Sequence, residues 1–438
     1  MSETICAIAT PPGRGGVGIV RISGTRIGAV AEALIGRLPE TRRARLVEVR
    51  DADGEPIDRG LALYFPAPHS FTGEDVLELH LHGSPVVLEM ALRAAVSAGA
   101  RRAGPGEFSQ RAFINDKLDL AQAEAVADLI AASSEQAARA ASRSLEGAFS
   151  RQVHALADAV TELRVWVEAA LDFPDEEIDF LAEGRVQARI EGLISETDAL
   201  LGQARAGRIL NDGLKIAIVG RPNAGKSSLF NALVRRDAAI VTEIPGTTRD
   251  VVRETVHLAG VPVILADTAG LRDTGDVVEL EGVRRAQAEL READLVLWVV
   301  DASDPEAVHR PETEVPVIRV DNKIDRLEAP PPADDGERIA LSALTGQGLD
   351  RLDRAVAEHF GLDESGIGEF SARARHVECI EAAVGRLAAA RDVLAETGSG
   401  ELVAEELRLA AEALGEITGH IHSDDLLGRI FSSFCIGK

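Results

Sequence analysis

The chain has 438 residues, of which 45% are hydrophobic and only 3% aromatic, and its formal net charge is −25. This length is typical of two to four domains, each able to bury a core built mainly from Leu, Val, Ile and Ala. The acidic balance argues against a protein whose whole surface grips nucleic acid or an anionic membrane, although a local basic patch or a partner could provide such contacts.

The spacing of the cysteines and the length of the apolar runs indicate in which cellular compartment the protein works. Cys6, Cys379 and Cys435 are too far apart for a disulfide framework or a zinc pattern, and they suit a reducing cytosol. The N-terminus lacks the basic-then-apolar pattern of a secretion signal, and apolar runs such as residues 295–300 are too short to span a bilayer. We therefore expect a soluble, cytoplasmic protein that has no membrane span.

Residues 1–117 combine strand and helix patterns. Residues 17–23, 61–65 and 76–82 are strand-like and are separated by Gly- and Pro-rich turns, whereas residues 85–100 have the period of one amphipathic helix. This segment therefore predicts an α+β domain.

Two segments with a helical pattern flank residues 213–362. The pattern is helical over 118–212 and again over 363–438, and the acidic run at 172–180 reads as a solvated loop. Helices are predicted at residues 119–145, 375–397 and 401–417. We expect one all-α domain, split in sequence, with residues 213–362 inserted into it.

The inserted segment alternates short apolar runs with helical ones, which is typical of an α/β fold with a mostly parallel sheet. Together with the nucleotide-binding motifs described next, it predicts a Ras-like P-loop domain. The apolar runs are residues 214–220, 261–267, 294–303, 315–321 and 338–343.

A phosphate-binding loop follows the first of these runs. The stretch from Gly220 to Ser228, GRPNAGKSS, matches G-x-x-x-x-G-K-[ST] between a predicted strand and a helix. Its glycines allow backbone N–H groups to surround phosphates, Lys226 reaches the β- and γ-phosphates, and Ser227 can ligate Mg²⁺. The predicted GTP contacts in this loop are Asn223, Ala224, Gly225, Lys226, Ser227 and Ser228.

Three further motifs each end a predicted strand. In DTAG, Asp267 would hold Mg²⁺ through water and Gly270 would donate to the γ-phosphate. In NKID, Asp325 would accept two hydrogen bonds from guanine, which adenine cannot donate. The third motif is SAL, in which a backbone N–H can meet guanine O6. The predicted contacts are Asp267, Thr268, Ala269 and Gly270 in DTAG, Asn322, Lys323 and Asp325 in NKID, and Ser342, Ala343 and Leu344 in SAL. The nucleotide should be GTP, not ATP.

Hydrolysis requires a further group, because Leu271 stands where Ras-like enzymes carry the glutamine that orients water. One alternative is Arg249 acting as an arginine finger, and another is a monovalent cation held beside the phosphates by Asn223. Thr248 should complete the Mg²⁺ shell. The switch-segment contacts are Thr242, Glu243, Ile244, Pro245, Gly246, Thr247 and Thr248.

The whole chain resembles the tRNA modification GTPase MnmE (TrmE) family. The middle motifs are shared with other GTPases, but the outer ones are specific to this family. The resemblance rests on residues 6–24, 73–85, 101–125, 220–233, 244–250, 267–272, 322–325 and the final FCIGK at 434–438.

The resemblance implies a subunit that hydrolyses GTP and modifies the wobble uridine of certain tRNAs. Its partner would be the flavoprotein MnmG, which carries FAD, and a 5-formyl- or methylene-tetrahydrofolate would donate the one-carbon unit. The product would be an aminomethyl- or carboxymethylaminomethyl-type uridine. The family forms a homodimer through its N-terminal domain.

The same resemblance implies ligands and catalytic groups. Ser227 and Thr248 would hold Mg²⁺, and Glu279 would orient the attacking water. K⁺ would replace the arginine finger, surrounded by Asn223, Thr242, Ile244 and Thr247.

The N-terminal domain resembles a folate-binding fold, in which Arg21, Glu78, Lys117 and Lys438 would contact tetrahydrofolate. Only five of the 47 basic residues are lysines. Two of them lie in the GTP motifs and two, Lys117 and Lys438, in the folate-associated ones, which supports these assignments since ammonium and guanidinium groups are not interchangeable in a tight site.

Three roles are open for Cys435: a buried inert thiol, a prenylation site, which CIGK fits poorly, or a reactive thiol near the folate. The resemblance favours the third. Two other functions compete with tRNA modification: a switch GTPase that acts by binding in ribosome assembly, and a GTPase anchored to a membrane through lipid on Cys435.

Overall fold

The structure is a computed structural model, and the residues that it describes fall into two compact units. The first unit comprises Met1–Ala127, Leu145–Glu162 and Arg408–Lys438, and the second comprises Asp128–Ser144 and Leu163–Leu407. The described residues are 3–172, 185–238, 253–258, 261–267, 293–304, 310–328, 338–360, 369–420 and 424–437.

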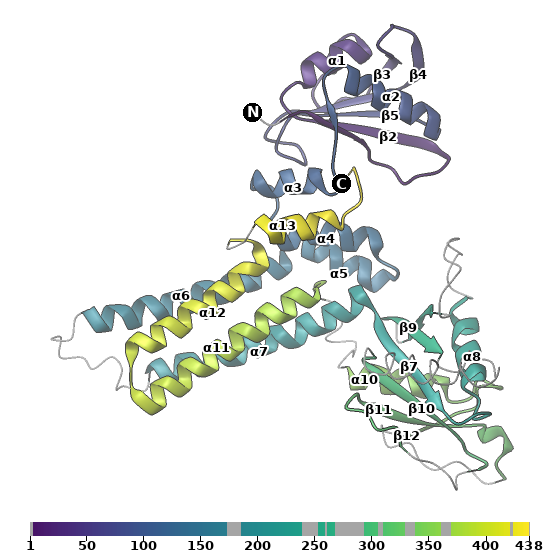
Figure 1. The fold of residues 1–438 in the computed structure, drawn as a ribbon, viewed down its shortest axis with the longest axis vertical. Coiled ribbons are helices and arrows are strands. Elements are labelled where there is room, and N and C mark those ends of the chain that lie inside the picture. The colour runs from purple at the N-terminus through teal and green to yellow at the C-terminus, as the bar shows by residue number, and fades with distance from the viewer. Residues whose placement is uncertain are drawn as a thin grey trace, which may run out of the picture. The chain divides into compact units, whose positions relative to one another are not determined.

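The N-terminal part of the first unit contains a six-stranded sheet of order β3-β4-β5-β2-β1-β6, of which Figure 1 labels β2 to β5. All neighbouring strands are antiparallel except β1 and β6, which are parallel. The strands are β1 (Ile5–Ile8), β2 (Gly15–Ser23), β3 (Arg45–Arg50), β4 (Pro56–Phe65), β5 (Val76–Gly83) and β6 (Arg101–Arg102). The three strands predicted for this segment lie within β2, β4 and β5.

The two faces of this sheet differ. One face is buried by α1 (Ile27–Ile35) and α2 (Pro85–Ser97), which pack on alternate residues of the strands. On the other face, Phe108 from α3 (Glu107–Ile114) and Phe71 pack against β1 in a smaller cluster. The polar residues of β2 and β5 that alternate with the buried ones therefore face away from α1 and α2.

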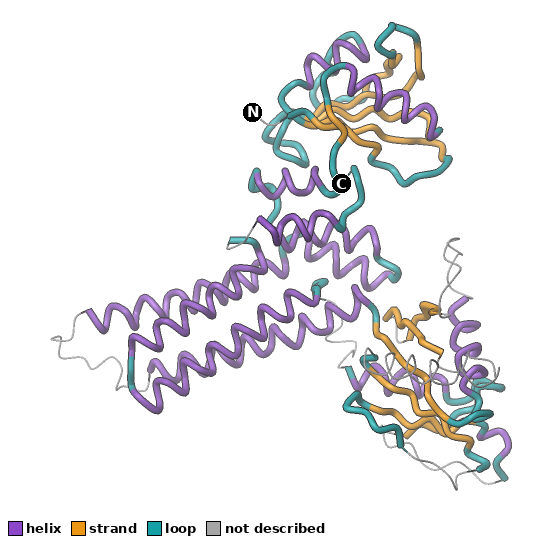
Figure 2. The backbone as a smooth tube through the Cα atoms, in the orientation of Figure 1, coloured by secondary structure: helices purple, strands orange, loops and turns teal. Residues whose placement is uncertain are grey.

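Long helices follow, shown as purple tubes in Figure 2. They are α4 (Leu120–Ala131), α5 (Glu135–Leu145), α6 (Ala148–Asp172), α7 (Arg185–Asp212), α11 (Ala374–Thr397), α12 (Gly400–Thr418) and α13 (Asp424–Ser432). The helix predicted at 119–145 is two helices, because the Ser134 hydroxyl accepts the backbone N–H of Ala137 and begins α5. The predicted acidic loop at 172–180 lies, after its first residue, outside the described residues.

Within the first unit, α13 packs on α4 and α3 through one apolar cluster. Its members are Leu120, Ala123, Leu427, Ile430, Phe431 and Phe434, with Phe113 against them. This packing brings the chain to residues 434–437, here called the C-terminal segment, beside the N-terminal sheet.

The inserted segment forms a second sheet of order β12-β11-β10-β7-β9-β8. The pairs are parallel except β8 with β9, which is antiparallel. Its elements are β7 (Leu214–Gly220), α8 (Lys226–Ala238), β8 (Arg253–Leu258), β9 (Val261–Asp267), β10 (Leu295–Asp301), β11 (Val317–Asn322), η1 (Ile324–Arg326), β12 (Arg338–Ala340) and α10 (Leu349–His359). This is the strand order of Ras-like P-loop domains, and the predicted fold class is confirmed.

Among the helices that the structure describes, none combines the length and hydropathy required to cross a membrane.

Candidate functional site

The loop between β7 and α8 has the backbone shape of a phosphate cradle. Asn223 and Gly225 have left-handed φ values of 64° and 96°, which turn successive N–H groups toward the same side. Lys226 begins α8, and its Nζ donates to the carbonyls of Gly220 and Arg221 at 2.8 and 2.9 Å. The lysine amine therefore lies within the loop, at the N-terminus of a helix, where an anion is favoured.

Asn322, at the end of β11, ties three predicted motifs together. It is 1% exposed, and its Nδ2 donates to the Ala224 carbonyl at 3.0 Å. Its Oδ1 accepts the backbone N–H of Ala343 at 3.0 Å. A Cβ on Gly225 would lie 2.2 Å from Asn322 Nδ2, so only glycine permits this contact. The phosphate loop is thus held in one register with NKID and with residues 342–344, the two motifs predicted to recognise the base and here called the base-recognition motifs.

Lys323 crosses the same edge of the sheet. Its Nζ donates to the Asn223 carbonyl at 2.5 Å and to Asp301 Oδ2 at 2.6 Å. Burial raises the pKa of Asp301, but hydrogen bonds from Lys323 and Ser303 outweigh burial and lower it overall. Sequence reasoning missed Asp301, although it too ends an apolar strand.

The guanine motifs meet through their side chains. Asp325 lies in η1, and its Oδ1 accepts the hydroxyl hydrogen of Ser342 at 2.5 Å. Ser342 is fully buried, whereas Leu344 is 84% exposed. Because each carboxylate oxygen has two lone pairs, Asp325 keeps capacity to accept donors from a base.

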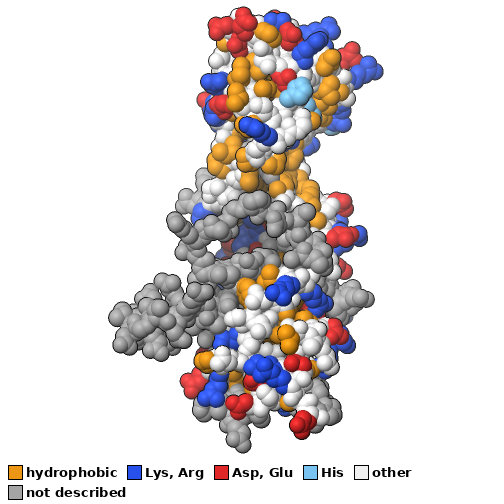
Figure 3. All heavy atoms as spheres, turned by 90° about the vertical axis from the view of Figure 1, so that its right-hand side faces the viewer, with side chains coloured by type: hydrophobic (Ala, Val, Ile, Leu, Met, Phe, Trp, Pro, Cys, Tyr) orange, Lys and Arg blue, Asp and Glu red, His pale blue; other side chains and the backbone are white. Residues whose placement is uncertain are grey.

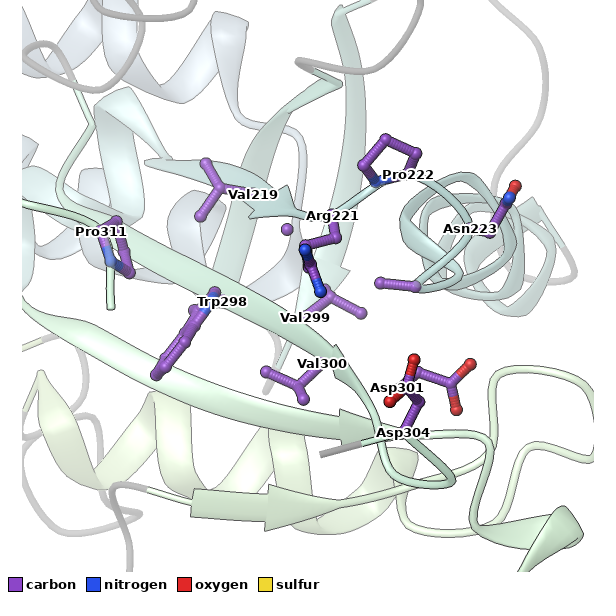
Figure 4. Close-up of a pocket in the computed structure, with 12 residues that line it drawn as sticks. Val219, Arg221, Pro222, Asn223, Trp298, Val299, Val300, Asp301, Asp304 and Pro311 are labelled. Atoms are coloured by element: carbon purple, nitrogen blue, oxygen red, sulfur yellow. The ribbon is translucent and has the colours of Figure 1, made fainter. Parts of the chain in front are cut away.

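A cavity of about 650 Å³ adjoins the phosphate loop between the carboxyl ends of β7 and β10. Figure 4 shows Trp298 and Pro311 toward one end, Asp301 and Asp304 toward the other, and Arg221 between them. A ligand in an open parallel sheet is expected at such a position, at the carboxyl ends of the strands.

Most residues of the predicted hydrolytic machinery lie outside the described part of the chain. Asp267 ends β9, but its side chain is not described. The predicted residues that lie outside the described part of the chain are Thr242, Glu243, Ile244, Pro245, Gly246, Thr247, Thr248, Arg249, Thr268, Ala269, Gly270, Leu271, Glu279 and Lys438. Among the described residues, no group of three His, Cys, Asp or Glu side chains could hold a metal ion.

A second polar site lies on the N-terminal sheet. Arg21 in β2 and Glu78 in β5 are direct cross-strand partners, and Arg21 Nε donates to Glu78 Oε1 at 2.9 Å. Their side chains are 23% and 15% exposed. The guanidinium carbon of Arg21 lies 5.7 Å from the Phe71 ring centre and 5.8 Å from that of Phe108, at cation–π distance. A partly buried ion pair with aromatic walls can bind a flat polar ring.

The C-terminal segment reaches this site. Pro105 and Ile436 form an isolated β-bridge, and the Gly106 N–H donates to the Cys435 carbonyl at 3.4 Å. Arg21 Nη1 donates to the Gly437 carbonyl at 3.4 Å. Gly437 has a φ of 97°, and a Cβ on it would lie 2.4 Å from the Ile8 carbonyl oxygen. Arg21 therefore contacts the C-terminal segment at Gly437, the residue that precedes the predicted Lys438.

Lys117 lies elsewhere on the same domain. It is exposed, and its aliphatic stem packs beside Gly73, in the loop that also carries Phe71. A separate cavity of about 750 Å³ is lined by Lys117 together with residues of α3, α4 and α13. The structure thus pairs Arg21 with Glu78, but places Lys117 beside the neighbouring loop.

The cysteines have contrasting environments. Cys6 is buried in β1, and burial raises the pKa of its thiol to about 11 despite nearby Arg102 and Arg101. Cys435 is exposed. Because the thiolate is the nucleophile and a raised pKa keeps the thiol protonated at neutral pH, Cys6 is expected to be a poor nucleophile. The first of the three roles for Cys435, a buried thiol, does not fit.

Comparison with known proteins gives two family matches. Residues 4–117 match the GTP-binding protein TrmE N-terminus, and residues 120–435 match the MnmE helical domain. Among solved structures, the chain is 27% identical to the G domain of the T. maritima FeoB iron transporter, covering 33% of this chain and 98% of that one with a TM-score of 0.25. It is also 27% identical to Aquifex aeolicus Era bound to GDP·AlF4−, covering 40% of this chain and 66% of that one with a TM-score of 0.27.

Proposed function

The chain belongs to the MnmE (TrmE) family of tRNA modification GTPases, and from this premise we propose that it is the GTP-hydrolysing subunit of a complex acting on the wobble uridine. The complex would add an aminomethyl or carboxymethylaminomethyl group at C5 of that uridine. The partner would be the FAD-containing flavoprotein MnmG, and the complex would work on tRNA in the cytoplasm.

One observation carries the GTPase part of the proposal. The buried Asn322 side chain bonds to the phosphate loop at Ala224 and to the base-recognition motif at Ala343. Asp325 lies in the same cluster with acceptor capacity for the two donors of guanine. A site built this way supports GTP as the nucleotide.

The residues that would hold cations suit hard ions. Ser227 offers a hydroxyl in the first turn of α8, and Asn223 offers an amide oxygen beside the loop. We assign Mg²⁺ to Ser227 and Thr248, and K⁺ to Asn223, Thr242, Ile244 and Thr247. When bound, both ions supply positive charge where negative charge develops on the phosphates. Glu279 would orient water.

The N-terminal site is the proposed tetrahydrofolate site. Glu78 can accept hydrogen bonds from the donor edge of the pterin ring. The basic groups Arg21, Lys117 and Lys438 can pair with the acidic glutamate tail of tetrahydrofolate. The exposed Cys435 lies two residues before Gly437, whose carbonyl bonds to Arg21. This proximity supports a role for the thiol near the one-carbon unit.

The domain and partner assignments follow from the family. We propose domains at 1–117, 118–212 with 363–438, and 213–362, and a homodimer formed through the first. Basic and acidic side chains are interspersed on the face of the N-terminal domain seen in Figure 3. With a net charge of −25, this supports a partner that supplies part of the tRNA contact.

The test is GTP hydrolysis by the purified protein in KCl and in NaCl at matched ionic strength, with ATP as control. The proposal predicts strong activation by K⁺ and no turnover of ATP. Equal rates in the two salts would exclude the K⁺ assignment. They would favour the alternative in which Arg249 acts as the arginine finger.

A further inference from the structure

The face of the N-terminal sheet that carries Glu78 also carries two histidines. In β5, Leu77, Leu79 and Leu81 are at most 2% exposed and pack under α1 and α2. Because side chains alternate along a strand, Glu78, His80 and His82 share the opposite face. His80 lies between Ile19 of β2 and Leu61 of β4, in the middle of the sheet.

The Glu78 carboxylate is held at both oxygens. Arg21 Nε donates to Oε1 at 2.9 Å, and His80 Nε2 lies 3.1 Å from Oε2. Since an ionised carboxylate only accepts hydrogen bonds, the His80 contact places the ring proton on Nε2. Two donors from different strands fix the carboxylate plane, which a single ion pair would leave free to rotate.

This arrangement leaves Glu78 able to bind a ligand. Each of its oxygens has a second lone pair, so the carboxylate can accept two more donors side by side. A reduced pterin offers such a pair, a ring N–H beside an amino group. The gain from this pairing depends on the orientation of the carboxylate, because a preorganised acceptor loses less freedom when the ligand binds.

We propose that His80 is a positioning residue of the tetrahydrofolate site: its Nε2–H holds the Glu78 carboxylate in the plane that accepts the pterin edge. This inference rests on the proposed function of the N-terminal domain. It assigns His80 no contact with the reacting carbon and no proton transfer.

The chain provides a matched control on the same strand and face. His82 Nδ1 lies 2.9 Å from Asp58 Oδ1, a contact of the same kind with a different carboxylate. Its side chain is 75% exposed, whereas that of His80 is 27% exposed. Loss of His82 therefore tests whether any histidine–carboxylate pair on this face affects ligand binding.

The experiment measures binding of 5-formyltetrahydrofolate to the full-length protein by titration calorimetry. His80→Leu should weaken binding about tenfold, because a Glu78 carboxylate that is no longer held by the ring N–H loses more freedom when the ligand binds. His80→Gln, whose Nε2 also carries an N–H, should remain within about threefold of the wild type, and His82→Leu should bind as the wild type does. Circular dichroism and GTP hydrolysis, which depends on the other sheet, check that each variant folds.

The outcomes separate the two claims. Wild-type affinity in His80→Leu overturns the positioning role alone. His80→Gln binding as weakly as His80→Leu also overturns it, because ring shape rather than the hydrogen bond would then matter. A folded wild-type protein that does not bind the probe overturns the folate proposal, and the positioning role falls with it.

Discussion

Replacement of Asn322 by alanine should weaken guanine-nucleotide binding far more than its single side chain suggests. The substitution removes the buried bond to the Ala224 carbonyl, 3.0 Å long, and the partly buried bonds from the Ala343 and Lys323 N–H groups, 3.0 and 2.8 Å long. A buried hydrogen bond contributes about 1 kcal/mol, and leaving its partner unsatisfied costs up to about 3 kcal/mol. Three lost bonds at about 1 kcal/mol each, with partial replacement by water at the less buried ones, give about 2–3 kcal/mol in total.

This free energy should appear mainly in binding, since the nucleotide must then bring the phosphate loop and the base-recognition motifs into register by itself. At about 1.4 kcal/mol per factor of ten, the affinity should fall roughly 30- to 150-fold. The assay is titration of a fluorescent GDP analogue into the variant and into Asn231→Ala, an exposed asparagine on α8 that serves as control. An Asn322→Ala affinity within threefold of the wild type would refute the reasoning.

Three further predictions concern the N-terminal domain and the C-terminal segment that contacts it. Burial raises the pKa of Glu107, but hydrogen bonds from Arg101, the Gly104 N–H and Arg111 outweigh burial and lower this pKa from 4.5 to about 2. The ionised carboxylate therefore stabilises the fold by up to about 3 kcal/mol above pH 4.5. This contribution is lost as the pH falls toward 2. Glu107→Gln should therefore flatten the acid side of the stability–pH curve, whereas Glu89→Gln, which removes a more exposed acid, should not; parallel curves for wild type and Glu107→Gln would contradict this. Gly437→Ala should weaken 5-formyltetrahydrofolate binding without altering GTP hydrolysis, because the added Cβ meets the Ile8 carbonyl and displaces the C-terminal segment; unchanged folate affinity would show that the segment does not form the site. Cys435→Ser should abolish tRNA modification and leave GTP hydrolysis intact, and wild-type levels of modified uridine in this variant would argue against a role for the thiol. In the native protein, iodoacetamide should alkylate the exposed Cys435 before the buried Cys6, which mass spectrometry can show.

The sequence predicted the inserted sheet well because its strands are short apolar runs bounded by motifs with strict spacing. The phosphate loop and Asn322 lie 98 residues apart, yet both were predictable since each motif ends a parallel strand and such ends share one edge. The break in the 119–145 helix was missed because Ser134 lies within an alanine-rich helical period that continues on both sides.

Side-chain partners between distant segments were the harder part. Asp301 ends an apolar strand like the predicted residues, but only the fold shows that Lys323 reaches it. His80 could have been found, because it shares a strand face with Glu78 by simple alternation. The contact of Arg21 with Gly437 spans 416 residues, and no local pattern predicts it.

The most direct test of the account is reconstitution of the modification with purified components. The protein, its flavoprotein partner, unmodified tRNA, NADH and methylene-tetrahydrofolate labelled at the one-carbon unit are combined, and label in tRNA uridine is measured with GTP, with ATP and with no nucleotide. The account predicts that label is transferred to tRNA in the reaction with GTP, and not in the reactions with ATP or without nucleotide. Hydrolysis of GTP without any label in the tRNA would contradict it and favour a GTPase that acts only by binding.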